Sequence, residues 1–244
     1  MQIQFILDYR SPYAYLANTR IMSMGVRIKF EPVEIVSVMK RVNNQPSPMC
    51  PPKAKYTGLD AARWAKHYGA PYSPNRPLLE ALRTGQLKSD LLSRAAIAAQ
   101  KLGVFQQVND ALFGAVWAGS AELTSTGDRL NFLKSRALPL ELWDIAESTE
   151  IQELLAANGE RAIAQGVFGV PTFFVDGEMF FGNDRLDFVR PGWMPQERRS
   201  TNDREAGACH GRGTRDRDVD RAAVRRGRLR CRHDREKRGA AASA

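Results

Sequence analysis

The sequence predicts an α/β fold in which a small sheet is interrupted by a large helical insertion and followed by a basic tail. Three observations predict it. Apolar residues alternate over residues 2–7, as in a half-buried strand. Helical patterns then follow one another over residues 53–165 without strand-like alternation. Finally, two short apolar runs flank Asp176-Gly177, a dipeptide typical of a tight β-hairpin.

The N-terminal residues are predicted to form a β-α-β unit. The first strand ends at Asp8, and a helix with one apolar face follows over residues 12–24. Gly25 ends this helix, because glycine tolerates the positive φ found at helix C-termini. Apolar and charged residues then alternate over residues 26–31, as in a second strand. One helix is long enough to connect two parallel strands.

A helical segment occupies the middle of the chain. Its length exceeds what a crossover between strands needs, so it is predicted to be an inserted helical domain over residues 53–165. Gly, Pro and Ser residues separate the candidate helices. These are 57–69, 76–84, 89–102, 104–118, 126–136 and 147–165.

After the insertion, the hairpin strands 172–175 and 178–181 lead into a final helix that opens at Asn183-Asp184-Arg185. Without the insertion, the order of elements is that of a thioredoxin-like fold. The chain is therefore predicted to have a discontinuous thioredoxin-like domain over residues 1–52 and 166–190. Because Pro191-Gly192 would stop the last helix early, the sheet beneath it is expected to be less well covered and the fold less stable.

The net charge of +9 belongs mainly to residues 191–244, which hold 15 Lys and Arg against 8 Asp and Glu. This Arg-rich tail has too few bulky apolar residues to form a core. A disordered tail and a reading-frame shift near residue 190 are both open interpretations. Nucleic-acid binding is not expected, because no aromatic residues are interleaved with the arginines.

Cysteine and histidine are scarce before the tail, where only Cys50 and His67 occur. This excludes a disulfide framework, a CxxC redox pair and a Cys/His zinc site in that part of the chain. The early Asp8 argues against a secretory leader, and no apolar run approaches the roughly 18 residues of a membrane span. A cytoplasmic protein that does not bind membranes is therefore expected.

The candidate catalytic residue is Ser11, in the link between the first strand and the first helix. Cysteine-based oxidoreductases place their thiolate at such a helix N-terminus, whose N–H groups and partial positive charge stabilise it. Here the link reads Ser11-Pro12-Tyr13-Ala14 and contains no sulfur. The Ser11 hydroxyl could instead donate a hydrogen bond to a thiolate carried by glutathione. The alternative is an ordinary helix start, with Ser at the N-cap and Pro following.

Val170-Pro171 precedes the hairpin and is predicted to be a cis peptide bond facing the helix that starts near Ser11. In that arrangement Val170 can pair through its backbone with a peptide such as glutathione, as an added strand. The alternative is a trans proline at the first position of a strand.

Three stretches of the sequence resemble the 2-hydroxychromene-2-carboxylate isomerases, which belong with the kappa-class glutathione transferases in the DsbA-like branch of the thioredoxin superfamily. The resemblance covers residues 1–190, and the tail has no counterpart. The stretches are FILDYRSPYAYLA, the set Asn44, Lys53-Ala54-Lys55-Tyr56, Asp60 and Arg63-Trp64, and GVFGVPTFFVDGEMFFGNDRLDFV.

The resemblance implies a role for some of the matching residues. Ser11 would activate the glutathione sulfur, and Val170, held by Pro171, would pair with the cysteine of glutathione. Asn183 and Asp184 would hold the γ-glutamyl group, and Asn44 and Lys53 would line the glutathione and substrate site. Outside this set, Asp60 and Arg63 are expected to form a surface pair on one helix.

The resemblance therefore implies a glutathione-dependent isomerase that acts on a small aromatic carboxylate and forms a homodimer. Lys53 could attract the carboxylate of such a substrate, although an exposed loop lysine with no role is an equal alternative. Two other functions remain open. One is a kappa-class-like transferase that conjugates glutathione to electrophiles, and the other is a non-catalytic DsbA-like binding protein. No metal is expected.

Overall fold

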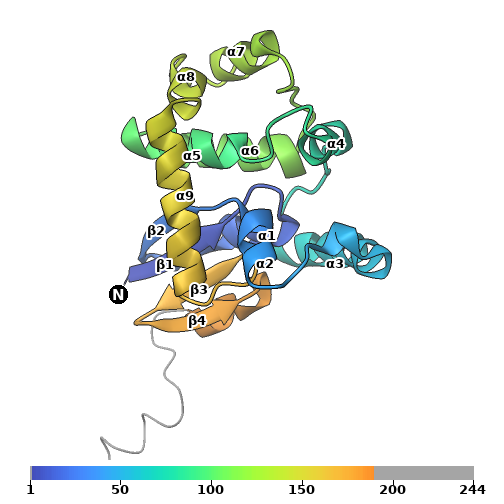
Figure 1. The fold of residues 1–244 in the computed structure, drawn as a ribbon. Coiled ribbons are helices and arrows are strands. Elements are labelled where there is room, and N and C mark those ends of the chain that lie inside the picture. Colours follow the sequence, from blue (N-terminus) through green and yellow to red (C-terminus); the bar gives the residue numbers. More distant parts are fainter. Residues whose placement is uncertain (1, 190–244) are drawn as a thin grey trace, which may run out of the picture. The chain divides into compact units, whose positions relative to one another are not determined.

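A computed structural model describes residues 2–189 of the chain (Figure 1). Its centre is a four-stranded sheet in the order β2-β1-β3-β4. The strands are β1 (Gln2–Leu7), β2 (Arg27–Pro32), β3 (Thr172–Val175) and β4 (Glu178–Phe181). β1 pairs in parallel with β2 and antiparallel with β3, and β3 pairs antiparallel with β4. The predicted thioredoxin-like arrangement is thereby confirmed.

The β-α-β unit and the hairpin form as the sequence predicts. α1 (Pro12–Ile21) connects β1 to β2, and the short helix η1 (Met22–Met24) extends it to Gly25, whose φ is +65°. In the hairpin, Asp176 and Gly177 have φ values of +50° and +86°. These are the two positive φ values that a type I′ turn requires, which explains the Asp-Gly sequence.

Side chains of the helices cover both faces of the sheet. Alternate residues of β1 point to opposite faces, so this strand contributes to two separate cores. Phe5 and Phe173 lie in the larger core, which includes side chains of α1 and of the helical segment. Ile6 and Phe174 lie in a smaller core on the other face, with side chains of α2 (Ile35–Arg41) and α9 (Thr149–Ala164). The label α9 in Figure 1 marks this long helix, which crosses the sheet.

The segment between β2 and β3 is mainly helical. All six predicted helices are present: the one predicted at 76–84 has those bounds, and the other five have shifted ends. Three short helices in this segment were not predicted from the sequence: α2, η2 (Ser47–Met49) and α8 (Leu142–Ala146). Each is too short to show a clear helical period. The other helices are α3 (Pro51–Tyr68), α4 (Arg76–Thr84), α5 (Leu91–Lys101), α6 (Phe105–Trp117) and α7 (Thr126–Lys134).

The chain after β4 forms η3 (Asn183–Arg185) and α10 (Leu186–Val189). The predictions for residues 191–244, and the early end of the last helix, lie outside the described residues. The division into a discontinuous thioredoxin-like domain and an inserted domain at 53–165 stays a prediction. Within residues 2–189, no helix has both the length and the apolar character that a membrane crossing requires.

Candidate functional site

Ser11 is the N-cap of α1, with the extended backbone (φ −93°, ψ 117°) usual at that position. Its Oγ accepts a hydrogen bond from the Ala14 N–H at 3.2 Å and donates one to the Val170 carbonyl oxygen at 3.3 Å. Its own N–H donates to the Asp8 carbonyl oxygen at 3.1 Å. The hydroxyl therefore lies between the start of α1 and the residue before Pro171.

The Val170-Pro171 peptide bond is cis, as predicted. Both residues are buried, and the Pro171 carbonyl oxygen accepts the Gly182 N–H at 3.0 Å. This hydrogen bond places the end of β4 beside the start of β3. Ser11, Val170-Pro171 and the start of η3 consequently lie at the same end of the sheet.

Asn183 and Asp184 directly follow Gly182 in the sequence, but their side chains have different surroundings. Asn183 is buried, and its Nδ2 donates to the hydroxyl of Tyr68 at 3.3 Å, while that hydroxyl donates to the Asn183 carbonyl oxygen at 3.0 Å. Asp184 is exposed and pairs with Arg185 at 2.6 Å. A Cβ on Gly182 would lie 2.4 Å from Asp184 Oδ1, so the glycine allows this carboxylate to fold back over the loop.

Asn44 and Lys53 come from the segment between α2 and the first turn of α3. Asn44 is exposed, and its Nδ2 donates to the Phe168 carbonyl oxygen at 2.8 Å, two residues from Val170. The structure therefore brings Asn44 close to the Ser11–Val170 contact. Lys53 is exposed and forms no ion pair within residues 2–189. Within the described residues, no hydrogen bond or ion pair joins it to the other candidate residues.

The predicted pairing of Asp60 with Arg63 is wrong. Asp60 accepts hydrogen bonds from the Tyr13 hydroxyl at 2.9 Å and from the Tyr56 hydroxyl at 3.3 Å. Burial, followed by the hydrogen bond to Asp60, raises the pKa of Tyr13 well above its ordinary value. Tyr13 therefore stays protonated and ties the first turn of α1 to α3. The spacing of charges along α3 could not reveal a partner on another helix.

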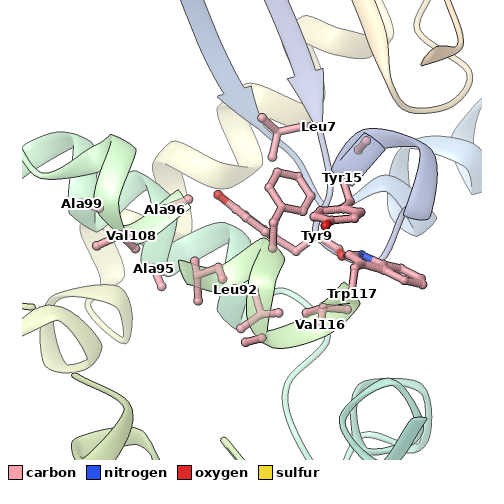
Figure 2. Close-up of a cluster of buried hydrophobic side chains, with 14 of the residues drawn as sticks. Leu7, Tyr9, Tyr15, Leu92, Ala95, Ala96, Ala99, Val108, Val116 and Trp117 are labelled. Atoms are coloured by element: carbon pink, nitrogen blue, oxygen red, sulfur yellow. The ribbon is translucent and has the colours of Figure 1, made fainter. Parts of the chain in front are cut away.

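The helical segment also holds the loop before Ser11. Trp117 Nε1 of α6 donates to the Tyr9 carbonyl oxygen at 2.8 Å, and the Tyr9 hydroxyl donates to Asn109 Oδ1 at 2.8 Å. Figure 2 shows Tyr9 and Trp117 within a cluster of buried side chains that includes Leu92 and Val116. Burial, together with nearby carboxylates, raises the pKa of Tyr9. A buried neutral phenol thus joins the loop after β1 to α6.

A cavity of about 660 Å³ lies between the C-terminal ends of α1 and α3 and the start of η3. Asn183 and Asp184 line it, together with Arg20, Trp64 and Tyr68, but Ser11 does not. The cavity therefore adjoins the Asn183 and Asp184 end of the predicted site, and Ser11 lies outside its lining. Within residues 2–189, no group of His, Cys, Asp and Glu side chains could hold a metal ion.

The fold and the Ser11 loop define a class of protein. The chain matches the family of DSBA-like thioredoxin domains over residues 2–191, and it belongs to this family. Because Ser11 and Ala14 occupy the two positions at which cysteines would form a CxxC pair, the described site has no thiol of its own for disulfide exchange.

The comparisons also confirm the resemblance to 2-hydroxychromene-2-carboxylate isomerases. The enzyme of that name from Pseudomonas putida is 30% identical over 199 residues, which cover 76% of this chain and 91% of the relative. Glutathione S-transferase kappa 1 of Caenorhabditis elegans is 22% identical over 200 residues, covering 77% of this chain and 88% of the relative.

Solved structures show the same fold. A 2-hydroxychromene-2-carboxylate isomerase superposes with a TM-score of 0.66 at 22% identity, covering 85% of this chain and 100% of that chain. The cytosolic disulfide reductase DsbM from Pseudomonas aeruginosa, in a structure with GSH, superposes with a TM-score of 0.53 at 15% identity, covering 84% and 99%. The roles of the individual residues in this chain stay predictions.

Proposed function

We propose that this protein is a glutathione-dependent isomerase of 2-hydroxychromene-2-carboxylate-type aromatic ketoacids. The observation that carries the proposal is the Ser11 hydroxyl, 3.3 Å from the Val170 carbonyl oxygen at the N-terminus of α1. The names of the isomerase relatives support the reaction class. The names of the kappa transferase relatives support the use of glutathione.

The candidate residues fit glutathione chemically. The tripeptide carries a thiol, two carboxylates and an ammonium group on an extended backbone. The helix N-terminus and the Ser11 hydroxyl suit a thiolate, and the backbone of Val170 suits an added strand. The exposed Asp184 carboxylate suits the ammonium group, and Asn44 and Lys53 offer donors to a carboxylate.

When bound, glutathione would supply a thiolate that adds reversibly to the conjugated double bond of the substrate, which permits rotation and involves no net oxidation. The Ser11 hydroxyl would turn from the Val170 carbonyl oxygen and donate its hydrogen bond to that sulfur. The α1 N-terminus would lower the pKa of the thiol further. Lys53 would hold the substrate carboxylate and orient the double bond.

The experiment that tests this function uses the full chain. Purified protein is incubated with glutathione and a 2-hydroxychromene-2-carboxylate, and the ultraviolet spectrum is followed while free glutathione is assayed. The proposal predicts a spectral change that requires glutathione and leaves its total amount unchanged. Spectra that do not change faster than in protein-free controls would refute it.

Lys53 provides a second test with a matched control in the same helix turn. Lys53→Met is expected to raise the KM for the carboxylate substrate, because it removes the charge that pairs with it. Lys55→Met removes an exposed charge two residues away and is expected to leave KM unchanged. Equal values of KM for the two variants would show that Lys53 does not bind the substrate carboxylate.

The kappa transferase relatives favour a second candidate, conjugation of glutathione to an electrophile. The same thiolate site would serve, but the adduct would persist. Consumption of glutathione in proportion to product would establish this function in place of isomerisation. The homodimer and the cytoplasmic location remain parts of the proposal, to be tested by sedimentation and by fractionation of cells.

A further inference from the structure

Three charged side chains form a cluster around the loop that leads into Ser11, and the sequence did not reveal it. They are Asp8 at the end of β1, Arg10 in the β1–α1 loop, and Glu34 at the start of α2. Their side chains are only 2%, 17% and 16% exposed. The cluster thus joins the loops that follow β1 and β2, the two parallel strands of the sheet.

Asp8 is the centre of the cluster. One carboxylate oxygen accepts the backbone N–H of Arg10 at 2.9 Å and its Nε at 3.0 Å. The other oxygen accepts the second guanidinium nitrogen at 2.6 Å and the Ile35 N–H at 3.0 Å. One buried carboxylate therefore fixes the backbone in both loops. The guanidinium binds it through two parallel hydrogen bonds, a geometry that lysine cannot reproduce.

Arg10 also joins Asp8 to Glu34. The guanidinium donates to one Glu34 oxygen, and the other oxygen accepts the Ser37 N–H at 2.7 Å, which caps α2. Two carboxylates surround one guanidinium, so the cluster carries a net negative charge. Asp8 and Glu34 therefore neutralise the Arg10 charge, which is not available to attract an anionic ligand.

The cluster controls the backbone that carries Ser11. The Ser11 N–H donates to the Asp8 carbonyl oxygen at 3.1 Å, which closes a turn over residues 8–11, and the Arg10 side chain holds that turn from outside. We propose that Arg10 is a positioning residue: it binds Asp8 and Glu34 and so sets the direction of the Ser11 hydroxyl toward Val170. This inference rests on the proposed function for its catalytic consequence.

The test compares Arg10→Lys and Arg10→Met with Arg83→Met in the full chain. Arg83 makes a similar two-bond contact with Glu80, but on the exposed surface of α4. Arg10→Lys keeps the positive charge, so Asp8 retains a cationic partner and the variant is expected to fold. Arg10→Met removes the contact completely.

Two readouts separate the proposal from a general loss of structure. Amide hydrogen exchange at Ser11 and Ile35 is expected to become faster in Arg10→Lys and faster still in Arg10→Met, with Arg83→Met unchanged. At saturating glutathione, kcat is expected to fall about 10-fold to 100-fold in Arg10→Met, with partial recovery in Arg10→Lys. The ultraviolet absorbance of the bound thiolate should show that the thiol pKa is raised in both variants, and more in Arg10→Met than in Arg10→Lys.

The two proposals fail in different ways. Exchange at Ser11 and kcat both unchanged in Arg10→Lys and Arg10→Met would overturn the role of Arg10. Wild-type protein that takes up no glutathione would overturn the proposed function, while the exchange rates at Ser11 would still support or refute the positioning role.

Discussion

Replacement of Ser11 by Ala removes one oxygen that makes two contacts, and its two consequences can be calculated separately. The contact with the Ala14 N–H, at 3.2 Å, caps α1. Loss of a serine N-cap costs about 1 kcal/mol of the free energy of unfolding. The Ser11→Ala protein is therefore expected to unfold at lower urea concentration but to remain folded at room temperature.

The second consequence concerns bound glutathione. The Ser11 hydroxyl, which donates to Val170 at 3.3 Å here, would donate to the thiolate when glutathione is bound. Loss of one such donor to a charged group costs about 1–3 kcal/mol, equivalent to about a 5-fold to 150-fold lower rate. The same energy would raise the thiol pKa by about one to two units, so activity should be regained as the pH rises.

The control is Ser125→Ala, which removes the N-cap of α7. Ser125 Oγ accepts the Asp128 N–H at 3.0 Å in an exposed capping box. This variant should lose similar stability and keep full activity. The assay is the isomerisation rate from neutral to alkaline pH at saturating glutathione. An Ser11→Ala rate equal to wild type across this range would refute the reasoning, and so would an equal loss in Ser125→Ala.

Two further substitutions test the loops around Ser11. Gly182→Ala is expected to weaken glutathione binding about 10-fold, because it introduces a Cβ at φ +109° and 2.4 Å from Asp184 Oδ1. Gly177→Ala is the control, with a φ of +86° and open space around its Cβ; comparable dissociation constants in calorimetry would contradict the argument. Trp117→Phe leaves the buried Tyr9 carbonyl oxygen without its donor and should cost about 1–3 kcal/mol of stability. An unchanged urea midpoint would show that this bond contributes nothing.

The sequence predicted those parts of the fold that depend on local backbone chemistry. Asp176-Gly177 specifies its hairpin because both residues must adopt positive φ, and Ser11-Pro12 specifies the start of α1. The cis bond before Pro171 was also predictable, because its place before a hairpin strand is characteristic of the fold. The proximity of Ser11 and Val170 could then be predicted from the order of the strands and helices.

The contacts that support the site could not be predicted in this way. Asp60 lies near Arg63 in the sequence, yet it accepts its hydrogen bonds from Tyr56 and from Tyr13 on another helix. Likewise, the charge cluster of Arg10 depends on α2, which is too short to give a periodic pattern. Such pairs join segments whose relative placement is fixed by packing across the whole sheet. Their residue types alone carry no signal of that placement.

The proposed function requires that this protein binds glutathione as a thiolate at the N-terminus of α1. Calorimetric titration of the full chain with glutathione, in buffers of different ionisation enthalpy, tests it most directly. Near neutral pH a free thiol, with a pKa of about 8.5, is mostly protonated, so binding as thiolate must release a proton to the buffer. We predict proton release in the wild type and less release in Ser11→Ala. No heat of binding, or binding without proton release, would contradict the claim.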